Sequence, residues 1–515
     1  MEKKINICDC TLRDGGYYTN WDFNEDTVNM YFNAMNDIPA ITHLEIGYRS
    51  MPKNEYLGEY FYCPQYILKM AKDLCPNKEI AIMLNEKDTK IDDLDELLVP
   101  YKGYIDLVRT AVAPANLDRA RILGKELKKR GFKVAFNFMY MSKWVTDISF
   151  IKKLNQLEGE VDYIYMVDSF GGVYPNDVKD ALLTIKREVS IPIGFHGHNN
   201  MELGLANSLT AIESGCEIID ATITGMGRGA GNLKTELLLT SLNSKGLINI
   251  DFNKLNPVVA EFEKMQKQYQ WGTSLPYMIS GAYSLPQKDV MGWIAKRRFT
   301  TESIINALQN RKNHLSDNHE VPVFKSETDA KSVVIIGGGP NAQKHAHALK
   351  LFCKENPDTV LIHAGSRFVE LFNELPNLQF YCLLGAEGYK LQKVLPKLNL
   401  HNVKCILEPS PRKMGTILPD QIISRTFELR KISFVNNYPD SLLTIAFQLS
   451  LDLNAYNVFL FGFDGYDMKT DEQMVEVSKE NQVLIDEFID SGSTLISLTP
   501  SNYHGFKTIS IYSKL

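Results

Sequence analysis

Short apolar runs alternate with longer amphipathic segments through the first half of the chain. Segments with helical periodicity, such as 117–130, 150–156, 176–188 and 201–214, separate the apolar runs. Eight runs have the length and composition of buried strands: 5–10, 43–47, 80–84, 105–111, 133–139, 163–167, 192–195 and 218–223. Eight such β/α units in about 245 residues are typical of a TIM (β/α)8 barrel, which we predict for residues 1–249.

The alternation of apolar runs and amphipathic segments stops after residue 249 and resumes at residue 332. Residues 250–325, with helical periodicity over 261–270 and 301–311, predict a helical appendage and linker. From residue 332 a strand, a glycine turn and a helix over 343–354 open a second α/β pattern. Its further strands are predicted at 359–363, 380–384, 404–407, 432–435, 458–461 and 494–497. We therefore predict a doubly wound, Rossmann-like parallel α/β domain over 332–515.

Composition narrows the classes of function. A chain of 515 residues is long enough for two domains or more. Its net charge of −6 argues against nucleic acid or an anionic membrane as the main partner. No apolar run approaches the ~20 residues that span a bilayer, and the N-terminus lacks the pattern of a signal peptide. A cytoplasmic location is expected, with the eight cysteines as buried free thiols.

Polar residues with metal-binding chemistry follow three of the predicted strands. Residues i and i+2 of a strand face the same side, so His196 and His198 can aim two imidazoles at one point. Asp14 can add a carboxylate oxygen, and Asn232 an amide oxygen at the end of a glycine-rich loop. Two nitrogens and an oxygen suit a divalent metal with open positions for substrate. Taken alone, such a histidine pair more often consists of surface or strand-packing residues than of metal ligands.

The three segments together are more specific. Residues 11–15 read Thr-Leu-Arg-Asp-Gly, residues 196–199 read His-Gly-His-Asn, and residues 225–232 read Gly-Met-Gly-Arg-Gly-Ala-Gly-Asn. In this order and spacing they resemble the metal-dependent lyase and synthase superfamily, the HMG-CoA lyase-like TIM barrels. Within it the chain is most similar to the 4-hydroxy-2-oxovalerate aldolases, which residues 165–169 and 281–284 also resemble.

The resemblance implies an aldolase that makes or breaks a carbon–carbon bond through a metal-stabilised enolate of pyruvate or another 2-oxo acid. It implies that Arg13 stabilises the enolate oxygen and that Ser169 and Tyr283 contact substrate. It assigns metal binding to Asp14, His196 and His198, with Asn232 as a fourth ligand or an orienting residue. The family favours Mn or Mg, and the ligand types also permit Co or Zn. Its substrates would be a small 2-oxo acid and an aldehyde, and a homo-oligomer is expected.

Tyr17 departs from the aldolase pattern, which has a histidine at this position as general base. The ordinary pKa of a phenol is ~10 and that of an imidazole is ~6.5, so a tyrosine is a poor base near neutral pH. Three alternatives follow: Tyr17 is a tuned acid and base, another group such as Tyr18 or His43 moves the proton, or the acceptor differs from acetaldehyde. A sugar-type aldehyde is one such acceptor.

Charged and polar residues within the predicted strands extend the candidate set. Glu45 and Arg109, and with less support Asn137, lie near the ends of their strands. Each is either a substrate-binding residue or part of a paired polar layer inside the barrel. The sequence leaves both alternatives open.

The second domain carries a weak ligand-binding pattern. Gly337-x-Gly339-x-x-Ala342 follows a strand, but no acidic residue ends the next strand and Pro340 removes an amide donor, which argues against NAD. A phosphate, nucleotide or nucleotide-sugar remains a candidate ligand for Gly337, Gly339 and Asp464. Residues 462–466, Gly-Phe-Asp-Gly-Tyr, end a later predicted strand near the same edge. Together with Gly-x-Gly-Pro at 337–340, they faintly resemble nucleotide-sugar-binding domains of bacterial surface-glycan enzymes. The alternative is a domain that only packs or oligomerises.

Two other functions compete with the aldolase. A Claisen-type acyl-CoA synthase of the isopropylmalate synthase kind would use the same barrel and metal. A barrel without catalysis could act as a scaffold for the second domain, although the retained metal-binding pattern argues against this.

Overall fold

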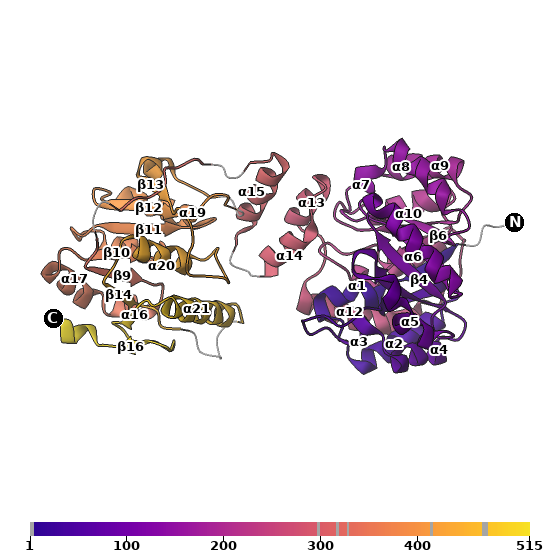
Figure 1. Cartoon of the computed structure of the whole chain (residues 1–515), viewed down its shortest axis with the longest axis horizontal. Helices are drawn as coiled ribbons and strands as arrows, with labels where there is room; N and C mark the ends of the chain where they lie inside the picture. The colour runs from indigo at the N-terminus through magenta and orange to yellow at the C-terminus, as the bar shows by residue number, and fades with distance from the viewer. Residues whose placement is uncertain (1–4, 296–298, 316–318, 327–328, 413–415, 466–471) are drawn as a thin grey trace. The chain divides into compact units, whose positions relative to one another are not determined.

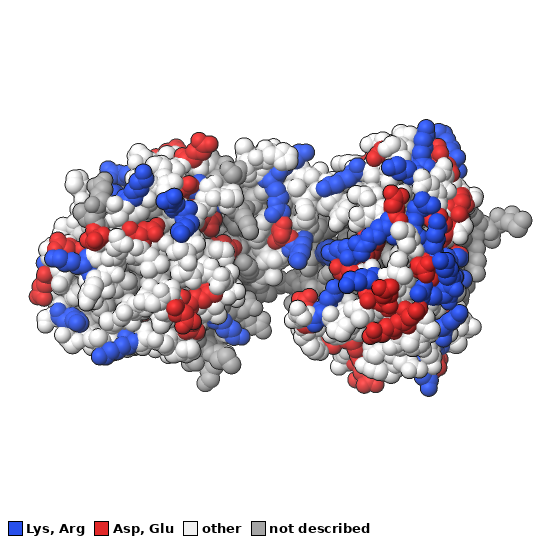
Figure 2. Space-filling view, viewed as in Figure 1, with Lys and Arg blue, Asp and Glu red and all other residues white. Residues whose placement is uncertain are grey.

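The computed structural model describes residues 5–295, 299–315, 319–326, 329–412, 416–465 and 472–515 of the chain. The chain divides into two compact units, Met1–Gly292 and Trp293–Leu515 (Figure 1). Acidic and basic side chains are mixed on the face of the first unit drawn in Figure 2. Among the described residues, no helix combines the length and apolar character needed to cross a membrane.

The first unit is a closed barrel of eight parallel strands in sequence order, which confirms the predicted TIM barrel. Each predicted strand is present, with ends shifted by a few residues at most. The strands are β1 Asn6–Asp9, β2 Ile41–Tyr48, β3 Glu79–Asn85, β4 Leu107–Val112, β5 Lys133–Phe138, β6 Tyr163–Asp168, β7 Ile193–Gly197 and β8 Ile218–Ala221.

Helices surround this barrel because their apolar faces must be covered. They are α1 Thr11–Thr19, α2 Glu25–Asn36, α3 Glu59–Tyr62, α4 Gln65–Leu74, α5 Leu94–Leu98, α6 Leu117–Lys129, α7 Met141–Trp144, α8 Ile148–Lys153, α9 Pro175–Glu188, α10 Gly204–Glu213 and α11 Thr235–Ser244. The main core lies between strands and helices, with Phe32, Phe136 and Phe195 fully buried there. A second, smaller layer fills the barrel interior and includes Cys8 and Tyr165.

The described residues of the segment predicted as an appendage form four helices: α12 Phe252–Tyr269, α13 Leu275–Ala282, α14 Gln287–Ala295 and α15 Thr301–Lys312. Helix α12 packs on α2 and so belongs to the body of the barrel unit. Helix α13 also lies in the first unit, whereas α15 lies in the second and α14 crosses the division.

The second unit contains an eight-stranded parallel sheet in the order β13-β12-β11-β10-β9-β14-β15-β16. Its strands are β9 Ser332–Ile336, β10 Val360–His363, β11 Gln379–Leu383, β12 Val403–Leu407, β13 Thr426–Glu428, β14 Asn457–Phe461, β15 Leu495–Ser497 and β16 Lys507–Thr508. The other helices are α16 Pro340–Lys344, α17 Ala346–Glu355, α18 Val369–Phe372, α19 Glu387–Gln392, α20 Leu442–Asp452 and α21 Glu472–Asp490. The parallel sheet is confirmed, and its assignment to a Rossmann-like fold stays a prediction.

The predicted strand over 432–435 is wrong. The edge strand is β13, a few residues earlier, and residues 432–435 are irregular. Phe434 instead packs edge-on against Phe447 of α20 and Phe488 of α21, with ring centroids 6.0 and 5.5 Å away. The apolar side chains of this run are therefore partly buried by packing against the core of the second unit, which needs no pairing with a strand.

Candidate active site

The turn from β1 into α1 places Arg13 and Asp14. Buried Asp9 at the end of β1 accepts hydrogen bonds from the Thr11 amide (3.0 Å) and hydroxyl (2.6 Å). It also accepts from Tyr31 (2.7 Å) and Thr235 (2.6 Å). These contacts fix the start of α1, so that its first turn carries Arg13 and Asp14 at the carboxyl end of the barrel, where TIM-barrel sites lie.

Asp14, His196, His198 and Asn232 come together from different parts of the chain. His196 Nε2 lies 3.5 Å from Asp14 Oδ2, and the two imidazole centroids are 5.2 Å apart. The Asn232 amide donates to Asp14 Oδ2 at 2.7 Å. All four side chains are buried. The sequence-based grouping of these four residues matches their positions in space.

The donor atoms of this group fit a divalent cation. Within the described part of the chain, buried His198 Nδ1 and Asn232 Oδ1 have no hydrogen-bond partner. Burial, and next the neighbouring His196, lower the pKa of His198 to about 3, so its imidazole is neutral at physiological pH. Burial raises the pKa of Asp14, but Arg13 and His196 outweigh this, and the net pKa is lowered. Neutral imidazoles and an ionised carboxylate are the forms that bind metals.

Asp220 at the end of β8 orients His196. Its Oδ2 lies 2.9 Å from His196 Nδ1 and 2.5 Å from Arg109 Nη2. Burial raises the pKa of Asp220, but Arg109 and His196 outweigh it and hold the pKa at about 2. An ionised Asp220 accepts a hydrogen bond from a protonated Nδ1 of His196. In this tautomer Nε2 carries the lone pair, and Nε2 is the nitrogen that faces Asp14. This is the carboxylate–histidine pairing that orients metal ligands in proteins.

Glu45 and Arg109 lie beneath the site and link its charges. Arg13 Nε donates to Glu45 Oε2 at 2.7 Å, and Arg109 Nη1 lies 3.1 Å from the same oxygen. Arg13 also pairs with Asp14. The contacts form a row of alternating charges inside the barrel that ends at the His196 imidazole: Asp14, Arg13, Glu45, Arg109 and Asp220. Neither Glu45 nor Arg109 is among the cavity-lining residues, which favours the interior-layer alternative for both.

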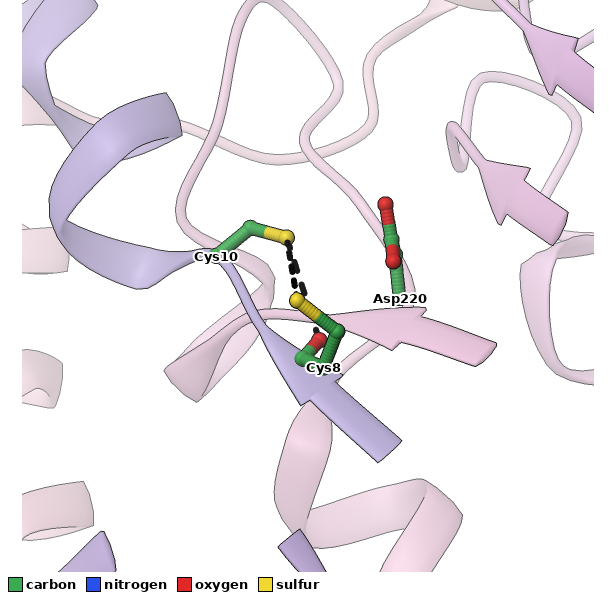
Figure 3. Close-up of side chains that lie close together, drawn as sticks. All are labelled: Cys8, Cys10 and Asp220. Carbon is green, nitrogen blue, oxygen red and sulfur yellow. Dashed lines mark hydrogen bonds between the residues drawn. The ribbon is translucent and has the colours of Figure 1, made fainter. Parts of the chain in front are cut away.

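Cys8, Cys10 and Asp220 also lie close together, as Figure 3 shows, and have the spacing of a metal-binding group. The two sulfurs are 3.8 Å apart. Arg109 already provides the cation here, since its Nη1 lies 3.6 and 3.3 Å from the sulfurs of Cys8 and Cys10. Burial raises the pKa of both thiols, which disfavours thiolates. All eight cysteines are free and buried, as predicted.

A cavity of about 290 Å³ opens above the candidate metal ligands. Several residues singled out from the sequence line it, namely Arg13, Asp14, Tyr17, Ser169, His196 and His198, and so does Asn137. Asn232 lies behind Asp14 rather than on the lining. Tyr283, at the end of α13, is half-buried and is not among the described residues of the lining.

Sequence reasoning missed three features of the lining: Tyr48, Arg228 and Gln287. Tyr48 Oη lies 3.1 Å from Tyr17 Oη. Arg228 sits in the glycine-rich segment 225–232, and its Cζ lies 4.0 Å from the centre of the Tyr17 ring. Burial, and next Tyr17, raise the pKa of Tyr48 well above its usual range, so Tyr48 keeps its proton and can donate it in a hydrogen bond to Tyr17. The position of Arg228 beside a motif glycine was the available signal.

In the second unit, Gly337 and Gly339 form the turn after β9. A Cβ on Gly337 would lie 2.6 Å from the Gly462 carbonyl oxygen, and one on Gly339 would lie 2.6 Å from Asp464 Cγ. Asp464 Oδ2 accepts from the Asn341 amide at 2.9 Å. The close approach of two loops thus accounts for these glycines, and Asp464 already occupies an amide that a phosphate would use.

The chain resembles known proteins over its first unit. The HMGL-like family profile matches residues 110–260. The 4-hydroxy-2-oxovalerate aldolase of Carboxydothermus hydrogenoformans is 30% identical over 270 residues, which cover 51% of this chain and 77% of that protein. The oxaloacetate decarboxylase of Mycobacterium tuberculosis is 24% identical, with 48% and 73% covered.

A solved structure is also similar to the barrel of this chain. The crystallised N-terminal domain of a Bacteroides vulgatus protein described as a candidate aldolase is 52% identical. The match covers 59% of this chain and all of that domain, with a TM-score of 0.56. The shared barrel and the aldolase relatives lead to one assignment: the chain belongs to the HMGL-like family and is a carbon–carbon lyase.

Proposed function

We propose that the enzyme is a divalent-metal-dependent aldolase that joins pyruvate or another 2-oxo acid to an aldehyde, or cleaves the product. The observation that carries the proposal is the buried group of Asp14, His196, His198 and Asn232, with unpartnered ligand atoms, at the base of a cavity. A cation held there, Mn or Mg by preference and Co or Zn by ligand type, would act as a Lewis acid on the 2-oxo acid carbonyl.

The residues around the cavity supply the remaining requirements. Arg13 is buried and fixed by Asp14 and Glu45, so its guanidinium is a preorganised cation for the oxygen that gains charge when the donor loses a proton. Ser169 and Tyr17 line the space above it. Tyr17, hydrogen-bonded to Tyr48, would give its proton to the aldehyde oxygen as the new bond forms.

The reaction balances without an oxidant or reductant. Condensation removes one proton from C3 of the donor, forms a bond from C3 to the aldehyde carbon, and delivers one proton to the aldehyde oxygen. Cleavage reverses these steps. A Claisen-type acyl-CoA synthase would require acyl-CoA and release free coenzyme A, so formation of free thiol separates it from the aldolase.

The test is deuterium exchange into the pyruvate methyl group, followed by NMR with and without Mn²⁺. We expect metal-dependent exchange that is lost in Arg13→Ala and in His196→Ala, and that persists in Arg187→Ala, which removes an exposed arginine from α9. Circular dichroism checks that the variants fold. Absence of exchange with every divalent metal tried would overturn a pyruvate aldolase.

Two broader expectations accompany this proposal. A cytoplasmic homo-oligomer acting on small molecules would agree with the composition, and size-exclusion chromatography with light scattering tests the oligomer.

A nucleotide or nucleotide-sugar at Gly337, Gly339 and Asp464 is a separate proposal, tested by titrating the full chain with uridine diphosphate.

A further inference from the structure

Three cations that line the cavity have no carboxylate partner among the described residues. The charged residues of the lining are Arg13, Asp14, Glu86, Lys87, Arg228 and Lys288. Both acids are already paired, Asp14 with Arg13 and Glu86 with Arg119 at 2.9 Å. Within the described part of the chain, no carboxylate forms an ion pair with Lys87, Arg228 or Lys288. The lining therefore has an excess of positive charge beyond the site of the candidate metal ligands.

Arg228 is the strongest candidate of the three for binding an anion, because it is half-buried whereas the two lysines are exposed. Charges removed from water are normally paired, since the desolvation of a lone ion is costly. Arg228 instead rests on the Tyr17 ring, with 4.0 Å from Cζ to the ring centre, a cation–π contact that satisfies one face of the guanidinium. Arg228 also forms a side-chain hydrogen bond with Tyr17, and the remaining N–H groups of its guanidinium are suited to an anion that enters the cavity.

The backbone around Arg228 is held in place. A Cβ on Gly227 would lie 2.5 Å from the Asn232 amide nitrogen, and one on Gly229 would lie 2.0 Å from Gln287 Oε1. Gly229 also has φ +65°, which favours glycine. Gln287 is itself anchored to Asn200 Oδ1 at 2.8 Å. The loop thus presents Arg228 from a fixed position, which reduces the entropy lost when a ligand binds.

We propose that the acceptor aldehyde carries an anionic group, a phosphate or a carboxylate, that Arg228 binds beside Tyr17, with Lys87 and Lys288 attracting it from the exposed rim. This specificity rests on the proposed aldolase function. The small aldehyde itself would lie at Tyr17, and its charged end would extend toward the three cations. A neutral short aldehyde such as acetaldehyde would leave Arg228 unpaired.

The experiment compares matched aldehydes with pyruvate as donor in the Mn²⁺-loaded full chain. D-glyceraldehyde 3-phosphate is paired with D-glyceraldehyde, and succinic semialdehyde with butanal. The measured quantity is the ratio of kcat/KM for the charged and neutral members of each pair. Because any general damage to the enzyme affects both members, the ratio reports recognition of the anion. We expect a ratio of at least tenfold for one pair, and which pair it is distinguishes phosphate from carboxylate.

Arg228→Gln should lower that ratio at least tenfold, and Lys87→Gln combined with Lys288→Gln should lower it less, with a weaker dependence on salt. The double variant also tests the proposal if Arg228→Gln does not fold. Arg187→Ala is the matched control and should keep the wild-type ratio. Ratios near one in the wild type, or an unchanged ratio in both variants, would overturn anion recognition. Pyruvate deuterium exchange in the same preparations shows separately whether the aldolase function holds.

Discussion

His196 Nδ1 lies 2.9 Å from Asp220 Oδ2, and the same oxygen lies 2.5 Å from Arg109 Nη2. One carboxylate thus joins a candidate metal ligand to a buried arginine at the centre of the barrel. Asp220 does not line the cavity, so it acts on chemistry only through His196. We therefore expect Asp220, held by Arg109, to position the His196 imidazole.

Asp220→Asn should weaken Mn²⁺ binding by about 10- to 100-fold, the usual effect of removing the partner of a metal-binding histidine. The amide cannot hold the Nδ1 proton as firmly as a carboxylate, so the Nε2 lone pair is less well oriented. Isothermal titration calorimetry measures the affinity. Asp180→Asn, on the exposed face of α9, is the control, and equal Kd values for the two variants would contradict the role of Asp220.

Tyr17→Phe should lower the rate of aldehyde addition at least tenfold, within the range of general acid–base contributions. The substitution removes the hydroxyl that Tyr48 contacts at 3.1 Å and keeps the ring beneath Arg228. Steady-state kinetics and pyruvate exchange are measured together, and addition should fall more than exchange. Near-wild-type addition would mean that Tyr17 only packs.

Arg109→Met should destabilise the first unit by roughly 3–5 kcal/mol, because Glu45 and Asp220 would stay buried without their shared cation. Urea unfolding followed by tryptophan fluorescence reports mainly this unit, since three of the four tryptophans, Trp21, Trp144 and Trp271, lie in it, and Trp293→Phe as the background variant removes the fourth. Arg187→Ala is the surface control and should change stability by no more than ~0.5 kcal/mol. A similarly small change for Arg109→Met would show that the buried ion pairs of Arg109 with Glu45 and Asp220 contribute little.

The raised pKa of Asp168 predicts that the stability of the fold depends on pH. Burial raises its pKa to about 7 although the Gly172 and Val173 amides donate to it. Between the usual pKa of Asp168 and about 7, the folded state binds a proton that the unfolded state lacks. The stabilisation of the folded state by this proton is therefore fully present below the usual pKa and is lost as pH rises through about 7. Its size is at most about 4 kcal/mol.

Unfolding midpoints of the wild type and Asp168→Asn, measured from pH 4.5 to 8, check this contribution. The wild type should lose more stability than the variant as pH rises through this window. Asp180→Asn should follow the wild type. Parallel curves for the wild type and Asp168→Asn would show that Asp168 titrates at its ordinary pKa.

The sequence by itself determined the barrel and the grouping of its candidate metal-binding residues. Strand periodicity is local, and parallel strands buried on both faces appear as continuous apolar runs, so all eight strands could be located. Polar residues at strand ends meet at one end of such a barrel, which brought Asp14, His196 and Asn232 together. The apolar run at 432–435 failed as a strand because local pattern does not distinguish pairing from packing.

Only the tertiary structure decided which charges are paired. Asp220 and Tyr48 were not singled out, because nothing in their local sequence separates them from ordinary barrel residues. From the sequence, Glu45 and Arg109 could equally bind substrate or belong to a paired polar layer inside the barrel. Their contact with each other beneath the cavity favours the polar layer. Arg228 stands out only when the partners of every neighbouring acid are known. Ion pairing depends on distances between residues far apart in the chain, and those distances are fixed by packing rather than by spacing in the sequence.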